Sequence, residues 1–283
     1  MRLPKIKTRN VRELIYYYQD LFKKQGLEGN IVELVLTHIL NKSKFELYLV
    51  QNLTLTYFQK RKFFKILKLV YEKNMPVQYI LGTQNFYGYD FKVSPSVLIP
   101  RFTTELLVDI AKNLKFKSVL DLCTGSGCIG LTLKKEVPGA KLVLTDISKK
   151  ALKIARVNMA SLDVDADLIQ SDLFENIQTK FDLIVANPPY LKYGEYISKN
   201  VYFEPKIALY AENNGFAIIQ KILAQFINYL NQDGKLLLEI SPSHQDLIQK
   251  KLPKGYKVDF HLDERNLVRF ALISGEIKWT KFI

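Results

Sequence analysis

The stretch SVLDLCTGSGCIGL, residues 118–131, decides the fold of this chain. It begins with a short, mainly apolar run that suits a buried strand, and it ends in a segment that suits a helix. Between them, residues 125–130 fit the pattern G-x-G-x-x-G of a nucleotide-binding turn. Small residues there let a ligand approach the backbone, whose free N–H groups point at an anionic group. The stretch predicts strand, turn and helix in the order of a nucleotide-binding fold.

Further strands and helices alternate after this stretch. Strands are predicted at residues 118–122, 141–146, 167–171, 181–186, 235–240, 257–262 and 267–273. Helices are predicted at residues 127–136, 148–160, 215–230 and 243–251. Such alternation is typical of a mostly parallel sheet that helices cover on both faces. No helix separates the last two strands, so we expect them to pair antiparallel. The predicted fold class is therefore α/β, with a Rossmann-like seven-stranded sheet.

Two further regions precede the sheet. Residues 1–74 carry apolar residues at helical spacing, and helix starts are predicted at Asn10, Asn30 and Ser43, each of which is followed three residues later by Glu. Residues 75–97 mix aromatic and β-branched residues with Gly and Asp, which predicts a linking β-hairpin. We expect a small helical bundle domain at 1–74, a hairpin linker at 75–97 and the α/β domain at 98–283.

Aromatic residues are frequent in the longest predicted helix of the first region, at about residues 54–73. Phe58, Phe63 and Phe64 recur there at helical spacing with Leu67 and Val70. We interpret them as the core of the bundle, and a docking face for a partner is the alternative.

A second informative stretch is FDLIVANPPY, residues 181–190. Its apolar run has the length of a strand, and the two prolines stop that strand because neither donates a ladder hydrogen bond. Asn187 and Tyr190 then lie at the carboxyl edge of the sheet, where ligands bind in open α/β folds. The Asn187 oxygen and the Pro188 carbonyl suit the two N–H groups of a planar amine or amide. A rigid corner with a half-buried Tyr190 is the alternative interpretation.

Carboxylates at two strand ends favour a nucleotide cofactor. Asp146 ends the second strand and suits both hydroxyls of a ribose, while Asp121 ends the first strand and suits an ammonium group. Asp172 and Leu173 follow the third strand, where an adenine is expected; a core position for Leu173 is the alternative. NAD and S-adenosylmethionine both fit the turn and Asp146. Asp121 and Asn187 favour S-adenosylmethionine, because an aligned amine acceptor serves methyl transfer and not hydride transfer.

Composition narrows the classes of partner. The net charge of +13 permits an acidic partner such as nucleic acid, but the lysines are spread along the chain. Three His and no CxxC pair predict no metal site. The two cysteines, the lack of an apolar span and the lack of a signal-peptide core predict a cytoplasmic protein without a membrane partner.

Taken together, these stretches resemble the HemK-type release factor glutamine N5-methyltransferases over nearly the whole chain. The segments that carry the resemblance are PVQYILG (76–82), IPR…TE (99–105), DLCTGSGCIGL (121–131), TDIS…AL..A..N (145–158), SDLF (171–174), NPPY (187–190), EP..AL (204–209), Gly215 and LEI…Q (238–245). The resemblance implies transfer of a methyl group from S-adenosylmethionine to the glutamine of a Gly-Gly-Gln motif in peptide chain release factors. S-adenosylhomocysteine is then the product, and no metal takes part.

The expected site residues follow from the motifs and the resemblance together. The cofactor-binding residues are expected to be Asp121, Cys123, Thr124, Gly125, Ser126, Gly127, Asp146, Asp172, Leu173 and Asn187. The substrate-binding residues are expected to be Asn187, Pro188, Pro189 and Tyr190, of which Asn187, Pro188 and Tyr190 carry the catalysis.

The sequence departs from the family pattern at one place and leaves two other functions open. Phe102 and Thr103 stand where the family usually has a proline and an acidic residue, which affects the expected shape of that loop. An amino-methyltransferase acting on DNA or RNA uses the same Asn-Pro-Pro-Tyr turn, although no target-recognition domain and no direct nucleic-acid substrate are expected. An inactive nucleotide-binding regulatory module is the third alternative.

Overall fold

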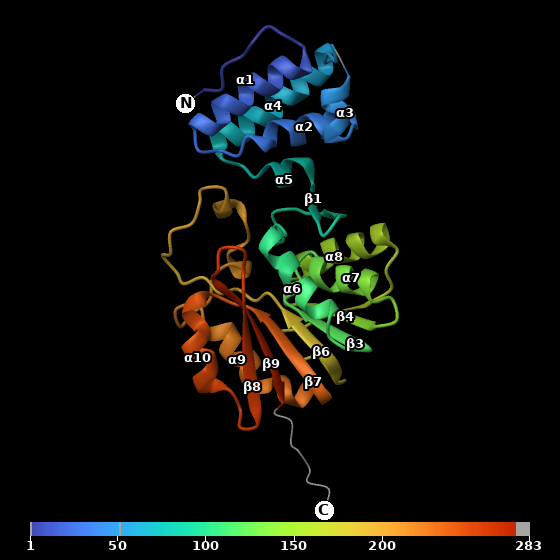
Figure 1. Cartoon of the computed structure of the whole chain (residues 1–283), viewed down its shortest axis with the longest axis vertical. Coiled ribbons are helices and arrows are strands. Elements are labelled where there is room, and N and C mark those ends of the chain that lie inside the picture. The colour runs from blue at the N-terminus through green and yellow to red at the C-terminus, as the bar shows by residue number, and fades with distance from the viewer. Residues whose placement is uncertain (1, 51, 276–283) are drawn as a thin grey trace, which may run out of the picture. The chain divides into compact units, whose positions relative to one another are not determined.

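The computed structural model describes residues 2–50 and 52–275. The chain divides into two compact units. The first comprises residues 1–82 with the short segment 198–203, and the second comprises residues 83–197 and 204–283. Figure 1 shows the elements of each unit.

The first unit is helical. Its helices are α1 (Val11–Lys24), α2 (Asn30–Leu40), α3 (Lys44–Leu49), α4 (Tyr57–Lys73) and α5 (Val77–Leu81). Asn10 caps α1, and Ser43 and Thr56 form capping boxes at the starts of α3 and α4. The cap expected at Asn30 is wrong, because Asn30 is already the first residue of α2. A helix over Val77–Leu81 also replaces part of the predicted hairpin segment.

Aromatic side chains fill the core of this unit. Tyr18, Phe22 and Phe63 are fully buried, and the hydroxyl of Tyr18 donates to the carbonyl of Pro4 at 2.8 Å. Phe64 is partly buried against the same cluster, whereas Phe58 is 78% exposed. The interpretation as a core is therefore confirmed for Phe63 and wrong for Phe58.

The second unit begins with a hairpin and continues as a seven-stranded sheet. The hairpin strands are β1 (Thr83–Phe86) and β2 (Tyr89–Lys92). The sheet strands are β3 (Ser118–Leu122), β4 (Lys141–Asp146), β5 (Asp167–Gln170), β6 (Phe181–Ala186), β7 (Leu230–Glu239), β8 (Tyr256–Leu262) and β9 (Val268–Gly275). Their order is β5-β4-β3-β6-β7-β9-β8; β3 to β7 run parallel, and β9 pairs antiparallel with both β7 and β8. The predicted fold class and the antiparallel final pair are confirmed.

Helices cover both faces of the sheet (Figure 1). They are α6 (Phe102–Lys112), α7 (Cys128–Glu136), α8 (Lys149–Leu162), α9 (Ala217–Gln225) and α10 (Gln245–Lys251). In β6, Leu183 and Val185 join the hydrophobic cluster of α6 and α7, while Ile184 and Ala186 join the cluster of α9 and α10. Successive side chains of a strand point to opposite faces, so an uninterrupted apolar strand serves both layers.

The boundaries of α9 and β7 differ from the prediction. The helix expected over 215–230 ends at Gln225, and a 3₁₀ turn follows over Phe226–Tyr229. The strand expected over 235–240 begins at Leu230 and contains a register shift: Leu230 pairs with Phe181, and Lys235 pairs with Leu183. Asp233 has φ 62° within this irregular segment. Residues 231–234, which lie between the two pairs, are polar or glycine, and such residues tolerate the unusual backbone angles of an irregular segment.

The strand order places a switch point between β3 and β6. The chain proceeds from β3 to β4 and β5 on one side, and it builds β6 and β7 on the other. Ligands of open α/β sheets bind where the carboxyl ends of such strands separate. The turn after β3 and the Asn-Pro-Pro-Tyr turn after β6 meet this condition.

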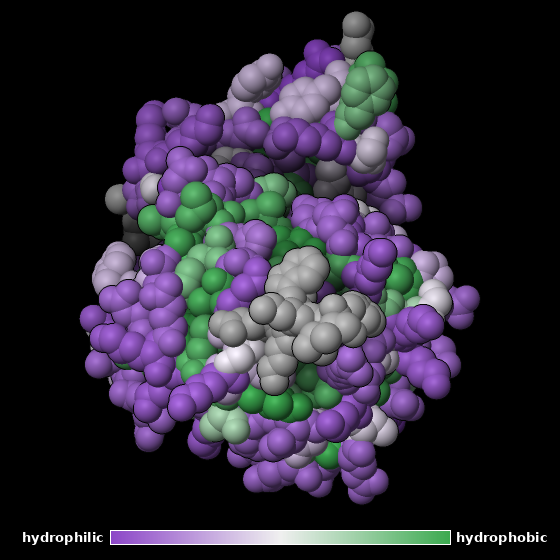
Figure 2. Space-filling view, turned by 60° about the horizontal axis from the view of Figure 1, so that its bottom comes forward, coloured by the Kyte–Doolittle hydropathy of each residue, from purple (hydrophilic) through white to green (hydrophobic). Residues whose placement is uncertain are grey.

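On the face drawn in Figure 2, hydrophilic residues form most of the surface and hydrophobic residues show between them. Among the residues that the structure describes, no helix is long and apolar enough to cross a membrane.

Candidate functional site

A cavity of about 220 Å³ lies at the carboxyl ends of the sheet strands. Segments that follow β3, β4, β5 and β6 contribute to its wall, as do the loop before α6 and residues 205–210. All lining residues belong to the second unit. The cavity therefore occupies the position that the strand order favours for a ligand.

The glycine-rich turn presents its backbone to this cavity. Gly127 is the N-cap of α7 with φ 83°, a left-handed conformation that a residue with a Cβ rarely adopts. The turn is closed by hydrogen bonds from the Gly127 nitrogen to the Thr124 carbonyl (2.8 Å) and from the Thr124 nitrogen to the Thr145 carbonyl (2.9 Å). Cys123, Thr124, Gly125 and Ser126 all line the cavity.

Asp146 at the end of β4 is tied to this turn. Its two carboxylate oxygens accept hydrogen bonds from the backbone nitrogens of Gly125 (2.9 Å) and Ser148 (2.8 Å). Burial raises the pKa of Asp146, and these two hydrogen bonds act in the opposite direction. Each carboxylate oxygen has further acceptor capacity, which suits a pair of ligand hydroxyls.

Asp121 lies fully buried beneath the turn. Its Oδ2 accepts from the hydroxyl of Thr124 (2.6 Å) and the backbone nitrogen of Gly130 (2.9 Å). Among the residues that the structure describes, none donates to Oδ1. Burial raises the pKa of Asp121 to about 7, and the negative charge of Asp146 contributes to the increase. A buried carboxylate oxygen without a donor suits a cationic ligand group.

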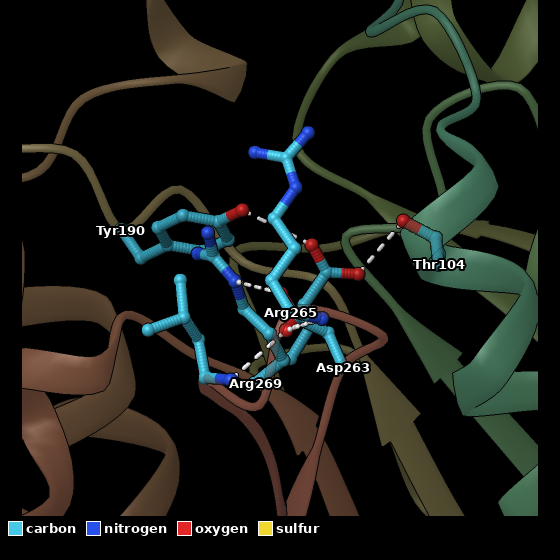
Figure 3. A network of polar contacts seen from close by, with 7 residues as sticks. Thr104, Tyr190, Asp263, Arg265 and Arg269 are labelled. Atoms are coloured by element: carbon cyan, nitrogen blue, oxygen red, sulfur yellow. Dashed lines mark hydrogen bonds and ion pairs between the residues drawn. The ribbon is translucent and has the colours of Figure 1, made fainter.

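Asn187 connects the cavity to a network of polar side chains. Its Nδ2 donates to Glu239 Oε2 (3.0 Å) and to Thr104 Oγ1 (3.3 Å). Thr104 Oγ1 donates to the same Glu239 oxygen at 2.7 Å, and the hydroxyl of Tyr190 donates to Glu239 Oε1 at 3.0 Å. Figure 3 shows Tyr190 and Thr104 reaching toward one another across the carboxylate that both contact.

Glu239, the last residue of β7, is the centre of this network. It is 3% exposed, and burial raises its pKa. The positive charges of Arg269 and Arg101 act against this increase. Arg269 is held by Asp263 Oδ2 at 3.1 Å, and Arg101 forms an ion pair with the buried Glu204. The surroundings thus supply three donors and two nearby cations to one buried carboxylate.

The chain after Asn187 is fixed by a close backbone approach. Gly215 has φ 85°, and a Cβ at this position would lie 2.1 Å from the carbonyl oxygen of Tyr190. The loop between them closes through hydrogen bonds from Leu191 N to Leu209 O (2.9 Å) and from Ala211 N to Leu191 O (3.0 Å). Only glycine fits between these backbone segments, which gives a physical reason for Gly215.

The cavity brings together many of the predicted site residues. Those that line it are Cys123, Thr124, Gly125, Ser126, Asp146, Asp172, Leu173, Asn187 and Pro189. Those outside its lining are Asp121, Gly127, Pro188 and Tyr190. Leu173 is also 7% exposed and belongs to the core cluster of α9, so both interpretations of this residue apply. The role of each residue in binding or catalysis stays a prediction.

Sequence reasoning missed Thr104 and Glu239 as site residues. Both were noted only as part of a resemblance, and they lie 135 positions apart in the chain. One signal was present: Glu239 follows the apolar run LLL at the end of a predicted buried strand. A carboxylate at such a position needs donors. Within residues 2–50 and 52–275, no group of three or more His, Cys, Asp or Glu residues is arranged to hold a metal ion.

Two family models match the chain. The model described as "PrmC N-terminal domain" matches residues 13–82, and the model described as "Methyltransferase small domain" matches residues 101–203. The first match lies in the helical region. The second covers the strands that precede the glycine-rich turn and the Asn-Pro-Pro-Tyr turn.

Similar proteins of known name agree with these matches. The "Release factor glutamine methyltransferase" of Borreliella burgdorferi is 36% identical, and the alignment covers 94% of each chain. The "Bifunctional methyltransferase" of Rickettsia prowazekii is 34% identical over 89% of this chain and 54% of its own length. The chain thus spans about half the length of that relative. A methyltransferase from Pyrococcus furiosus shares the fold with a TM-score of 0.54 and 20% identity, covering 68% of this chain and 91% of that one.

Proposed function

Because the chain belongs to the release factor glutamine methyltransferase family, we propose that it methylates the side-chain amide nitrogen (N5) of a glutamine in peptide chain release factors. The proposed target is the glutamine of the Gly-Gly-Gln motif, and the proposed methyl donor is S-adenosylmethionine. The observation that carries the proposal is the orientation of Asn187 at the cavity wall.

The cavity and the residues beneath it offer hydrogen-bonding groups that suit S-adenosylmethionine. Asp146 would accept the ribose hydroxyls, and the backbone of residues 123–126 would lie against the methionine part of the cofactor. Asp121 lies beneath the turn and outside the cavity lining, and its Oδ1, for which the described residues provide no donor, is proposed to pair with the cofactor's ammonium group. Asp172 and Leu173 would flank the adenine. When bound, the cofactor supplies an activated methyl group, and the reaction needs no metal.

Asn187 would orient the glutamine amide. Its Nδ2 faces Glu239 and Thr104, so its Oδ1 is left to accept an N–H of the substrate. The Pro188 carbonyl would accept the second N–H, and Tyr190 and Pro189 would lie against the faces of the amide. An amide nitrogen is a poor nucleophile because its lone pair is delocalised, so alignment toward the methyl group is the main task of the site. Such alignment is worth roughly 7–11 kcal/mol in favourable cases.

The helical unit would bind the release factor. The "PrmC N-terminal domain" model matches residues 13–82 and excludes the cavity residues. We therefore assign the cofactor to the cavity of the second unit and recognition of the protein substrate to residues 1–74 with the hairpin near residues 78–88. A cytoplasmic location follows from this substrate, since translation termination takes place in the cytoplasm.

Label transfer tests the proposal directly. The protein is incubated with methyl-labelled S-adenosylmethionine and separate pools of purified release factors, other proteins, DNA and RNA. We expect label in the release factors and, by mass spectrometry, a methyl group on the glutamine of the Gly-Gly-Gln motif. Label on DNA or RNA with unlabelled release factors would instead identify a nucleic-acid amino-methyltransferase.

A further inference from the structure

We propose that Glu239 is a positioning residue: its carboxylate fixes the amide of Asn187 so that Oδ1, and not Nδ2, faces the substrate. This inference rests on the proposed function, because it explains how the acceptor for the glutamine amide is held. It also makes a structural claim about Asn187 that can be measured without any substrate.

The geometry selects one of two orientations for the Asn187 amide. The oxygen and nitrogen of an asparagine amide are nearly equal in size, so a half-turn about the last bond exchanges them at little steric cost. Glu239 Oε2 lies 3.0 Å from Asn187 Nδ2. An ionised carboxylate only accepts hydrogen bonds, and the exchanged orientation would place two acceptor oxygens against each other. The carboxylate therefore excludes that orientation.

Thr104 completes the selection. Its hydroxyl donates to Glu239 Oε2 at 2.7 Å, so its remaining lone pairs accept from Asn187 Nδ2 at 3.3 Å. The hydroxyl proton is already engaged by Glu239, and Thr104 thus presents an acceptor to Asn187. Glu239 and Thr104 thus both present acceptors to Asn187, and only its Nδ2 can donate to them.

The same carboxylate holds Tyr190. Glu239 Oε1 accepts from the Tyr190 hydroxyl at 3.0 Å, while Oε2 accepts from Asn187 and Thr104. Two side chains of the Asn-Pro-Pro-Tyr turn are thereby fixed to one residue on a neighbouring strand of the sheet. The turn is held by β7 and α6 as well as by its own prolines.

Burial of Glu239 gives an independent reason to expect a role. Removing a carboxylate from water is costly, and an apolar residue of similar volume is often as stabilising or more so. Leu236, Leu237 and Leu238 precede it in the same strand and are fully buried. A carboxylate at the next position is thus explained better by what it orients than by stability.

Nuclear magnetic resonance of the Asn187 side-chain amide tests the structural claim. In the full-length wild-type chain with S-adenosylhomocysteine, we expect one amide proton of Asn187 to be shifted and protected from exchange. Glu239→Gln is nearly isosteric, but its amide can donate to or accept from Asn187, so the shift and the protection should diminish. Thr104→Val should act in the same direction with a smaller effect. Unchanged Asn187 signals in Glu239→Gln would overturn the inference.

Turnover on release factor provides the second measurement. Glu239→Gln should lower kcat about 10²-fold, the scale of a small misalignment at a reacting centre. Its affinity for S-adenosylhomocysteine should remain close to that of the wild type. The matched control is Thr132→Val, since Thr132 is fully buried on α7 and its hydroxyl has no partner among the described residues. It loses a hydroxyl, as Thr104→Val does, and should change neither kcat nor the Asn187 signals.

The two measurements separate this inference from the proposed function. If wild-type protein methylates no release factor while Glu239→Gln still alters the Asn187 signals, the proposed function fails and the orientation by Glu239 stands. If wild-type protein methylates release factor and Glu239→Gln does so with the same kcat, the positioning role is wrong, whatever the Asn187 signals show.

Discussion

The two sides of the cavity are built in different ways. The glycine-turn side, which comprises residues 121–130 and Asp146, relies largely on backbone groups, and the hydrogen bonds to its two carboxylates join residues at most 21 positions apart. The asparagine side, which comprises Thr104, Asn187, Tyr190 and Glu239, relies on side chains that lie 49 to 135 positions apart.

This difference indicates how substitutions should separate affinity from rate. The backbone donors of the glycine-turn side remain when a side chain is changed. On this side, only substitution of a carboxylate should therefore remove a contact to the ligand. Every hydrogen bond that joins the four residues of the asparagine side depends on particular side chains. We therefore expect substitutions on the glycine-turn side to weaken cofactor binding and substitutions on the asparagine side to slow methyl transfer.

Asn187→Ala should have the largest effect. It removes one of two proposed acceptors for the glutamine amide, and the loss of one positioned hydrogen-bonding group lowers a rate by roughly 10²–10³-fold. Single-turnover methylation and calorimetry with S-adenosylmethionine measure rate and affinity separately. Asn176→Ala is the control, because Asn176 donates to the Gln170 carbonyl and does not line the cavity. If Asn187→Ala lost cofactor affinity as well as rate, the claim that the asparagine side governs the rate and the glycine-turn side the affinity would be wrong.

Asp146→Ala should weaken cofactor binding without slowing a saturated enzyme. The carboxylate contributes charge-assisted hydrogen bonds worth on the order of 1.5–3 kcal/mol, or about 10- to 10²-fold in affinity. Calorimetry gives the affinity, and kcat at saturating cofactor gives the rate. Asp182→Ala is the control, since Asp182 lies near the start of β6 and accepts hydrogen bonds from Lys117, Ser118 and Asn231. A large fall in kcat for Asp146→Ala would show that this residue also orients the reaction.

The sequence predicted the glycine-turn side better than the asparagine side, because the contacts of the glycine-turn side join residues that lie closer together in the chain. Strand, glycine turn and helix follow one another in a single stretch, and Asp146 ends the next strand at a characteristic spacing. The contacts of Asn187 depend on which strand and helix pack beside it. Strand order and helix packing bring Thr104 and Glu239 to Asn187, and no local pattern specifies this arrangement.

The elements that differed from prediction also depend on long-range contacts. The register shift of β7 depends on its pairing with Phe181 and Leu183 in β6, and the extent of α9 depends on the 3₁₀ turn that leads into β7. Asn30 carries the expected capping spacing to Glu33, yet the helix starts there without a side-chain cap. Local propensity is a weak signal where packing decides the boundary.

Gly215→Ala should disturb the asparagine side through its backbone. The new Cβ would approach the Tyr190 carbonyl to 2.1 Å, and the positive φ adds strain. We expect a loss of roughly 1–3 kcal/mol in the free energy of unfolding and a lower methylation rate. Gly139→Ala is the matched control, because no atom of the described residues lies within 4 Å of a Cβ at that position. Denaturant unfolding and turnover measure the two effects. If Gly215→Ala had the stability and the methylation rate of the wild type, the turn at Tyr190 could move to accommodate the new Cβ.

Asp121→Asn should change stability in a pH-dependent way and thereby show how much stability the buried carboxylate of the glycine-turn side costs the ligand-free chain. Burial raises the folded-state pKa of Asp121 to about 7 from the ordinary value of 3.8. The folded chain therefore binds a proton more readily than the unfolded chain between these values, and the contribution of Asp121 to stability falls as the pH rises from about 4 to about 7. Asparagine does not ionise, so the Asp121→Asn variant should not lose this contribution to its free energy of unfolding as the pH rises.

Unfolding of the ligand-free wild type and variant at pH 5 and pH 8 measures the difference. We expect Asp121→Asn to gain stability relative to the wild type between the two pH values, by roughly 2–3 kcal/mol. Its affinity for S-adenosylmethionine should fall at the same time, because the carboxylate proposed to pair with the ammonium group is gone. An equal stability difference at both pH values would mean that Asp121 ionises at its ordinary pKa. Asp121 Oδ1, which has no donor among the described residues, would then carry no desolvation cost that a ligand relieves, and the glycine-turn side would bind its ligand through the backbone and Asp146 alone.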